Sequence, residues 1–301
     1  MLELLEMMRP LNCLMGLVAV FIGALLVAGQ GISGFYVPLG YALFAVFVIT
    51  GAGNVLNDYV DVEADKVNRP RRAIPSGKVS KRSALGFSVI LFLLGIVSAG
   101  FINWICFFIA VINSLVLIIY SLVLQHKLLL GNLAVGYLVG SIFLFGGASI
   151  GNVSLLAIPA ILMVLAMLAT ISREIVKDME DMEGDRKSFL KRITMKVTES
   201  IGERFGLTRA GVKIKYGERT MIVIAVACLM LAIVFSYLPH YYGFMGMGYV
   251  FLVGIADLVF IWCMYSLVRE RKKRKGYRRI SKRLKIGMFI ALIAFIVGAF
   301  V

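Results

Sequence analysis

Long uncharged apolar runs alternate with short charged segments along the whole chain. A helix needs about 20 apolar residues to cross the hydrocarbon core of a bilayer. Nine runs meet this length, and they lack the alternating polarity of a membrane barrel. The expected spans are 11–29, 37–59, 84–101, 104–124, 132–150, 154–176, 220–238, 245–268 and 286–301. The pattern therefore predicts an all-α polytopic membrane protein with nine transmembrane helices.

The 32 Lys and Arg residues fall in every second connection between these runs. Because positive residues stay on the cytoplasmic side, we expect a multi-pass protein of the cell membrane with its N-terminus in the cytoplasm and Val301 outside. Two cytoplasmic segments are long, at about 60–83 and 173–219. Within the second, 187–205 has helical spacing that suits either an amphipathic helix over the cytoplasmic mouth or a solvated linker helix.

The composition agrees with a membrane protein and narrows its partners. Of 301 residues, 60% are hydrophobic and 16% are charged, which excludes an ordinary soluble domain. The net charge is +15, but the basic residues lie in short loops between spans, so nucleic acid is not an expected partner. The four cysteines lie in apolar runs without a CxxC pair, and we interpret them as buried hydrophobic residues.

Acidic and amide side chains gather at the cytoplasmic end of the second run, in GNVLNDYVDVEAD. Asn57, Asp61 and Asp65 are four residues apart and share one helix face, with Asp58 one step round and Asn54 before them. Carboxylates near a bilayer repel one another and are costly to bury. Mg²⁺ is the expected compensation, because it prefers oxygen ligands and bridges carboxylates to phosphates.

The sixth run ends in a second acidic cluster, REIVKDMEDMEGD. Asp178, Asp181 and Asp185 are at i, i+3 and i+7, again on one face. Both runs end on the same side of the membrane, so the two acidic faces can meet across one cavity. The simpler alternative is a pair of solvated helix ends.

Basic residues stand beside both clusters. Arg69, Arg71 and Arg72 follow the first, and Arg173 and Lys177 precede Asp178 in the second. Carboxylates beside Arg and Lys suit a diphosphate whose oxygens bind Mg²⁺ and guanidinium together. Each base alone also suits a positive-inside anchor.

The two clusters resemble the motifs of the UbiA superfamily of intramembrane prenyltransferases, NDxxDxxxD and DxxDxxGD. This chain has NDYVDVEAD at 57–65 and DMEDMEGD at 178–185, and Tyr120 and Lys127 match the family's Tyr and Lys of the fourth loop region. RPLN at 9–12, RPRRAIPSG at 69–77 and Gly131–Asn132 fit as well. The resemblance spans nearly the whole chain and is strongest to the archaeal ether-lipid branch, but the extended charged stretch after Asp185 departs from it.

The resemblance implies one transmembrane prenyltransferase domain over 1–301, with helices around a central cavity and cytoplasmic loops capping the active site. It implies Mg²⁺-dependent transfer of a geranylgeranyl group from geranylgeranyl diphosphate to the hydroxyl of geranylgeranylglyceryl phosphate, in ether-lipid synthesis. The expected partners are the lipid bilayer, an isoprenoid diphosphate donor and a lipid-like phosphate acceptor. An aromatic, haem or chlorophyll acceptor is the alternative within the superfamily.

The resemblance also implies roles for individual residues. The implied metal ligands are Asn57, Asp58, Asp61, Asp65, Asp178, Asp181 and Asp185. The implied catalytic residues are Asp61, Asp65, Asp181, Asp185 and Lys127. The implied substrate-binding residues are Arg9, Asn12, Asn54, Arg69, Arg72, Tyr120, Asn132, Arg173 and Lys177.

Two other classes of membrane protein would have different sequence patterns. A phosphatidyl-transfer enzyme of the CDP-alcohol type would have one continuous acidic motif, without a second cluster about 120 residues later. A transporter would have broken helices or repeated halves with polar sites near the midplane. Here the charges gather at the cytoplasmic helix ends instead.

Overall fold

The computed structural model describes residues 2–198, 217–269 and 274–300, with the side chains of 183–198 left out. The described part contains helices and connections but no strand. Its helices are α1 (Leu2–Met7), α2 (Pro10–Ala28), η1 (Gly29–Phe35), α3 (Tyr36–Val60), α4 (Val62–Asn68), α5 (Lys81–Gly100), α6 (Trp104–Leu122), η2 (Leu124–His126), α7 (Leu128–Ala148), η3 (Val153–Leu155), α8 (Ala157–Thr198), α9 (Glu218–Ser236), α10 (Leu238–Tyr241), α11 (Met247–Arg269) and α12 (Arg274–Gly298). The prediction of an all-α fold is confirmed.

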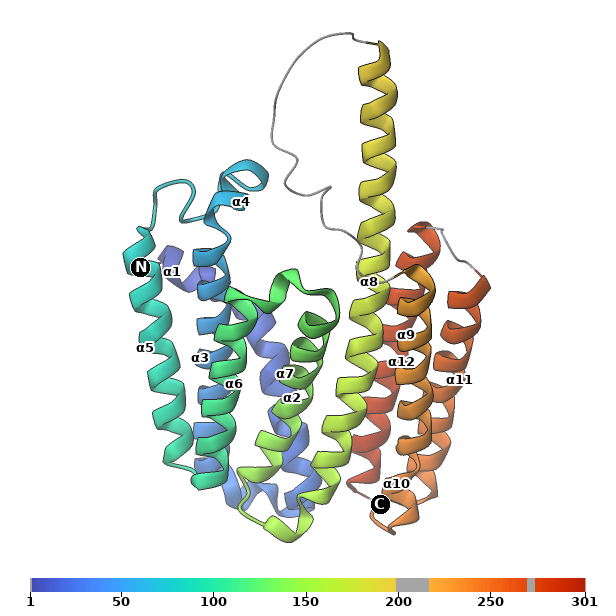
Figure 1. Cartoon of the computed structure of the whole chain (residues 1–301). Coiled ribbons are helices and arrows are strands. Elements are labelled where there is room, and N and C mark those ends of the chain that lie inside the picture. The colour runs from blue at the N-terminus through green and yellow to red at the C-terminus, as the bar shows by residue number, and fades with distance from the viewer. Residues whose placement is uncertain (1, 199–216, 270–273, 301) are drawn as a thin grey trace.

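The long helices lie side by side along one common axis, running alternately up and down, as a membrane bundle requires (Figure 1). Seven described segments are long and apolar enough to cross a membrane, and the first, Pro10–Val60, contains both of the first two expected spans. The last expected span, 286–301, falls in α12, which is not among the seven. The protein is therefore a multi-pass membrane protein, and the total of nine spans stays a prediction.

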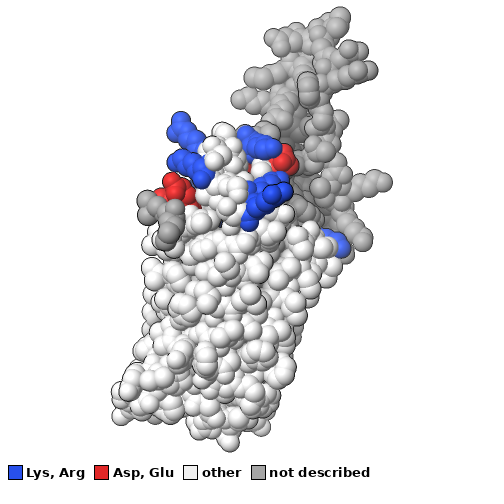
Figure 2. Space-filling view, turned by 90° about the vertical axis from the view of Figure 1, so that its left-hand side faces the viewer, with Lys and Arg blue, Asp and Glu red and all other residues white. Residues whose placement is uncertain are grey.

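Charged side chains gather at one end of the bundle. On the face that Figure 2 shows, Lys, Arg, Asp and Glu lie at the upper end and the rest of the described surface is uncharged. The helices α1 and α4 lie at this charged end, whereas α12 ends at the opposite one (Figure 1). The two ends of the molecule thus differ in charge, as the positive-inside pattern predicts.

Glycines allow close approach of the helices at the centre of the bundle. A Cβ at Gly23 of α2 would lie 2.0 Å from the Phe143 carbonyl oxygen, and one at Gly146 of α7 would lie 2.1 Å from that of Val20. A Cβ at Gly140 of α7 would lie 2.4 Å from the Met163 carbonyl oxygen of α8. Small residues at helix crossings are typical of membrane bundles, where packing rather than hydrophobic burial holds helices together. Helix α7 is thereby packed between α2 and α8.

One element differs from the sequence interpretation. We expected 173–219 to be a loop containing a separate helix, but α8 is continuous from Ala157 to Thr198 and projects beyond the bundle (Figure 1). The segment has no proline after Pro159, so nothing interrupts the backbone hydrogen bonding after the apolar part ends. The remainder of the expected 187–205 helix lies outside the described residues.

Candidate active site

The first acidic motif lies where α3 passes into α4. The helical hydrogen bonding is nearly continuous across this point, since the Asp61 amide donates to the Asn57 carbonyl at 2.9 Å and the Asp65 amide to the Asp61 carbonyl at 2.8 Å. The local i+4 repeat predicted from sequence is therefore present. The side chains, however, divide between two environments.

Asp58 and Asp65 are buried and share one guanidinium. Arg72 Nη1 lies 3.0 Å from Asp58 Oδ1 and 2.6 Å from Asp65 Oδ2, and Arg9 Nη2 lies 2.5 Å from Asp58 Oδ1. Asp58 is 9% and Asp65 7% exposed, so removing one partner would leave a nearly dry charge uncompensated. These pairs fasten the 69–72 segment and the α1–α2 corner to the end of α3.

The α1–α2 corner is held by further contacts with α3. Arg9 has φ 53°, a left-handed conformation that is unfavourable for a residue with a Cβ. The Met8 carbonyl accepts from Asn54 Nδ2 at 2.8 Å and from Cys13 Sγ at 3.2 Å, which fixes the corner in place. Asn54 therefore orients the backbone at Arg9, and Asn12 lies exposed in the first turn of α2.

Asn57 and Asp61 face the opposite way, toward the end of α6 and the short η2 helix. Ser121 Oγ donates to Asn57 Oδ1 at 2.5 Å, and Gln125 Nε2 donates to Asp61 Oδ1 at 3.2 Å. The sequence placed Asn57, Asp61 and Asp65 on one face. In the structure Asp65 instead joins Asp58 at Arg72, which lies 14 residues away from Asp58 in sequence.

The second acidic row lies on α8. Asn132 Nδ2 of α7 donates to Asp178 Oδ2 at 2.7 Å, and Asp181 is exposed one turn further along. Asp185 lies on the same helix, but its side chain is outside the described part. A Cβ at Gly131 would lie 2.7 Å from the Leu124 carbonyl oxygen, so glycine there lets η2 pack against the start of α7 and brings Asn132 to Asp178.

Tyr120, near the end of α6, lies within electrostatic range of Asp61 of the first row and of Glu174 and Asp178 of α8. Both rows therefore approach the end of α6. A metal site shared by the two rows stays a prediction.

The predicted basic residues surround this region with different degrees of burial. Arg69 and Arg71 are exposed and line a hollow of about 450 Å³ together with Pro70 and Arg72. Lys127 is exposed at the N-cap position of α7. On α8, Arg173 pairs with Glu174, and Lys177 Nζ lies 3.2 Å from Glu174 Oε2.

Three polar residues of this site were not selected from the sequence: Ser121, Gln125 and Glu174. Glu174 was visible as the residue four positions before Asp178 in the same helical stripe. Ser121 and Gln125 carry no signal of their own, since their contacts with Asn57 and Asp61 span 64 residues.

The donor set suits Mg²⁺. Asn57, Asp61, Asp178 and Asp181 supply amide and carboxylate oxygens, which are the ligands that this hard cation prefers. In the part of the chain that the structure describes, no group of three or more His, Cys, Asp or Glu side chains forms a ready-made cage. Mg²⁺ commonly takes only one or two carboxylates and completes its shell with water and substrate phosphate, so the residues present fit the ion.

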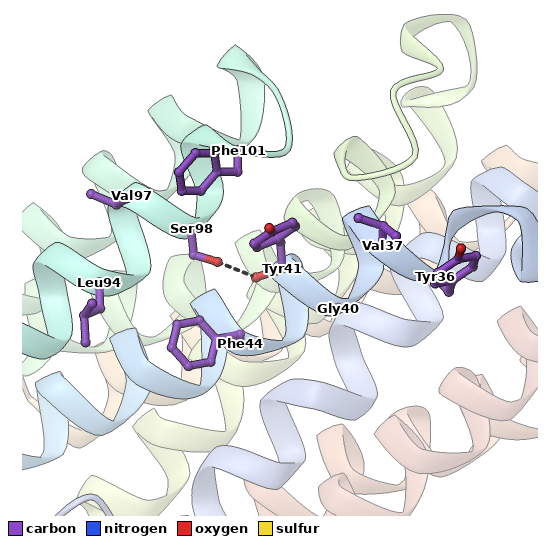
Figure 3. A pocket seen from close by; sticks show the side chains of 9 residues that line it. All are labelled: Tyr36, Val37, Gly40, Tyr41, Phe44, Leu94, Val97, Ser98 and Phe101. Carbon is purple, nitrogen blue, oxygen red and sulfur yellow. Dashed lines mark hydrogen bonds between the residues drawn. The ribbon is translucent and has the colours of Figure 1, made fainter.

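A larger apolar hollow of about 540 Å³ lies elsewhere, between the start of α3 and the end of α5. Figure 3 shows Tyr41 and Phe101 beside it, with Ser98 Oγ donating to the Tyr41 carbonyl at 3.0 Å. Because α3 begins here and carries its acidic motif at its other end, this hollow is remote from the acidic rows.

Comparisons with known proteins find a matching family model and full-length relatives. The family model described as the UbiA prenyltransferase family matches residues 16–293. A curated digeranylgeranylglyceryl phosphate synthase from Methanosarcina mazei is 41% identical, covering 98% of this chain and 97% of the relative.

Solved structures have the same fold. A structure of a digeranylgeranylglyceryl phosphate synthase is 36% identical, has a TM-score of 0.83, and covers 99% of this chain and 98% of its own. A UbiA homolog from Archaeoglobus fulgidus, described as bound to GPP and Mg²⁺, has a TM-score of 0.54 and 12% identity, covering 97% of this chain and 99% of its own. At that identity the second likeness concerns the fold alone.

Proposed function

The chain belongs to the UbiA prenyltransferase family and is a prenyltransferase, and we propose that it makes digeranylgeranylglyceryl phosphate. In this reaction the geranylgeranyl group of geranylgeranyl diphosphate moves to the free hydroxyl of geranylgeranylglyceryl phosphate. The observation that carries the proposal is that both acidic rows lie at the charged end of an apolar bundle, where Gln125 binds Asp61 and Asn132 binds Asp178. The name of the Methanosarcina mazei relative supports the choice of acceptor.

The donor diphosphate binds at the level of the two acidic rows. Asn57, Asp61, Asp178, Asp181 and Asp185 would hold Mg²⁺ directly or through water, while Asp58 and Asp65 stay in their ion pairs with Arg72. When bound, the ion neutralises charge on the diphosphate and makes it a better leaving group. Arg72, Lys127 and Lys177 supply further positive charge around the same oxygens.

The reaction forms one C–O bond and breaks another. The allylic C–O bond of the donor breaks and its electron pair leaves with the diphosphate. The acceptor hydroxyl oxygen bonds to the allylic carbon and gives up its proton to a carboxylate of the site or to the departing diphosphate. The apolar helices below the rows hold the prenyl chains and limit access of water to the allylic cation.

In this proposal the N-terminus and the acidic rows face the cytoplasm and the end of α12 faces outward. The segments 60–83 and 173–219 belong to the cytoplasmic cap of a single domain over 1–301. The positive-inside distribution of Lys and Arg supports this orientation.

An in-vitro prenylation assay tests the proposal. The purified protein is supplied with radiolabelled geranylgeranyl diphosphate and, in separate reactions, with geranylgeranylglyceryl phosphate, 4-hydroxybenzoate, haem or chlorophyllide. We expect label to be transferred to the glyceryl phosphate ether. Transfer to one of the other acceptors, with none to the ether, would reject the acceptor while keeping the family.

A further inference from the structure

Helix α8 contains buried polar atoms that have nothing to bind. Within the described part of the chain, Thr170 Oγ1, Ser172 Oγ and Arg173 Nε are buried without a hydrogen-bond partner. All three lie inside the apolar segment Val153–Met182. Buried polar groups in folded proteins are nearly always paired, so each of these atoms needs an explanation from the side of the helix on which it lies.

Thr170 belongs to the face of α8 that carries the acidic row. Thr170, Glu174 and Asp178 are at i, i+4 and i+8, so they form one stripe along the helix. Thr170 is only 4% exposed. At 1.5 Å per residue, its Cα lies about 12 Å from that of Asp178, toward the centre of the bilayer.

Arg173 lies next to Thr170 on the helix surface, three residues along. Its Nη1 donates to Glu174 Oε1, which holds the guanidinium by one nitrogen, and its side chain is 21% exposed. The Nε atom belongs to the edge of the guanidinium that Nη1 does not share. That edge is the one that binds two oxygens of a phosphate side by side.

Ser172 lies on a different side of α8 from Thr170 and Arg173. It shares a stripe with Val176, four residues later, which packs in a core cluster with Met221 of α9 and Ile280 of α12. Ser172 is 0% exposed and turned away from the acidic face. It is therefore a matched control on the same helix.

We propose that Thr170 and the Nε edge of Arg173 bind the phosphate monoester of the lipid acceptor, with Glu174 as a positioning residue for Arg173. The inference rests on the proposed function. The donor diphosphate is bound at the level of Asp178, whereas Arg173 lies about 7 Å along the helix toward the bilayer centre. A second phosphate at this depth brings a neighbouring hydroxyl to the allylic carbon just below the diphosphate.

The test separates binding of the two substrates. Thr170→Val and Arg173→Gln are purified with Ser172→Ala as the control, and each is checked for monodisperse folding. Binding of geranylgeranylglyceryl phosphate is measured by calorimetry without Mg²⁺ or donor, and KM is measured for each substrate in the full reaction. Geranylgeranylglycerol, which lacks the phosphate, is the comparison ligand.

We expect the Kd for the phosphate acceptor to rise about 10-fold in Thr170→Val and about 100-fold in Arg173→Gln, with Arg173→Lys between them. Ser172→Ala and the KM for the donor should stay within about twofold of wild type. Geranylgeranylglycerol should have the same Kd for wild type and Arg173→Gln, because it lacks the phosphate that Arg173 binds.

Other results overturn the proposal. A rise in donor KM with unchanged acceptor binding would show that Thr170 and Arg173 bind the donor diphosphate instead of the acceptor phosphate. Equal losses in Ser172→Ala and Thr170→Val, or no change in any variant, would make the orphaned atoms purely structural. Wild type that neither binds nor prenylates the phosphate acceptor would instead reject the proposed function itself.

Discussion

Individual carboxylates of the first motif have two different tasks. Asp58 and Asp65 are buried against Arg72 and Arg9, whereas Asp61 lies with Gln125 toward the second acidic row. The buried pair keeps the 69–72 segment in place, and Asp61 remains available to bind Mg²⁺ in the proposed function. Residues that look equivalent in NDYVDVEAD are therefore expected to respond differently to substitution.

We expect Asp61→Asn and Asp181→Asn each to reduce kcat by about 100-fold or more, because each removes an anionic ligand for the ion that stabilises the leaving group. Glu63→Gln is the matched control. The hydrogen bond from Lys66 lowers the pKa of Glu63, so this exposed carboxylate is charged and pairs with Lys66. Steady-state kinetics on purified variants measure the effect, and equal losses in Glu63→Gln and Asp61→Asn would contradict it.

Arg72→Ala should destabilise the protein by about 3 kcal/mol, because two buried carboxylates lose their shared partner. Thermal unfolding in detergent, followed by loss of the monodisperse chromatographic peak, measures this. Adding Asp58→Asn and Asp65→Asn to Arg72→Ala should recover most of the lost stability, since both buried carboxylates are then neutral and the Arg9 side chain, 36% exposed, stays in contact with water. A triple variant as unstable as Arg72→Ala would show that the pairs do not hold the segment.

At the scale of helices, the position of the second acidic row depends on α7. Asn132 of α7 binds Asp178 of α8, and α7 itself is held between α2 and α8 at glycine contacts. The active-site geometry therefore depends on close helix packing well below the charged end.

Gly146→Ala should destabilise the bundle by roughly 1–3 kcal/mol, because the new Cβ would lie 2.1 Å from the Val20 carbonyl oxygen and α2 must shift. Gly86→Ala on α5 is the control, since a Cβ there meets nothing within 4 Å. That change should be neutral or stabilising, by up to about 1 kcal/mol from helix propensity. Unfolding of both variants in one detergent compares them, and similar stability would show that the α2–α7 contact tolerates a methyl group.

At the scale of the whole molecule, charge distinguishes the two ends of the bundle. The acidic rows and most basic residues lie at one end, and the connections at the other end are uncharged. Because Lys and Arg gather at the end that carries the acidic rows, we expect this end to face the cytosol, where the diphosphate substrate of the proposed reaction would bind.

The orientation can be checked by labelling single cysteines in intact cells with a membrane-impermeant maleimide. Lys78→Cys, at the charged end, should stay unlabelled until the membrane is opened, whereas Asn152→Cys, between α7 and α8, should react at once. Both positions are exposed, and the four native cysteines are buried or half-buried in apolar helices. The reverse labelling pattern would invert the proposed topology.

Removal of divalent ions should stop turnover, because the two rows come from opposite halves of the chain and their carboxylates need a shared cation. We expect EDTA to abolish prenyl transfer and added Mg²⁺ to restore it, with protein folding unchanged in both states. Full activity in EDTA would remove the metal from the mechanism.

The sequence by itself determined the helical membrane fold, the charged end and the two acidic rows. Apolar run length and i+4 spacing depend on local backbone geometry, which is the same wherever a helix lies. Only the tertiary structure decided that Asp58 and Asp65 share Arg72, that Arg9 reaches Asp58 across 49 residues, and that Asn132 binds Asp178. Such contacts depend on how loops and helices pack, and no spacing along a single helix contains that information.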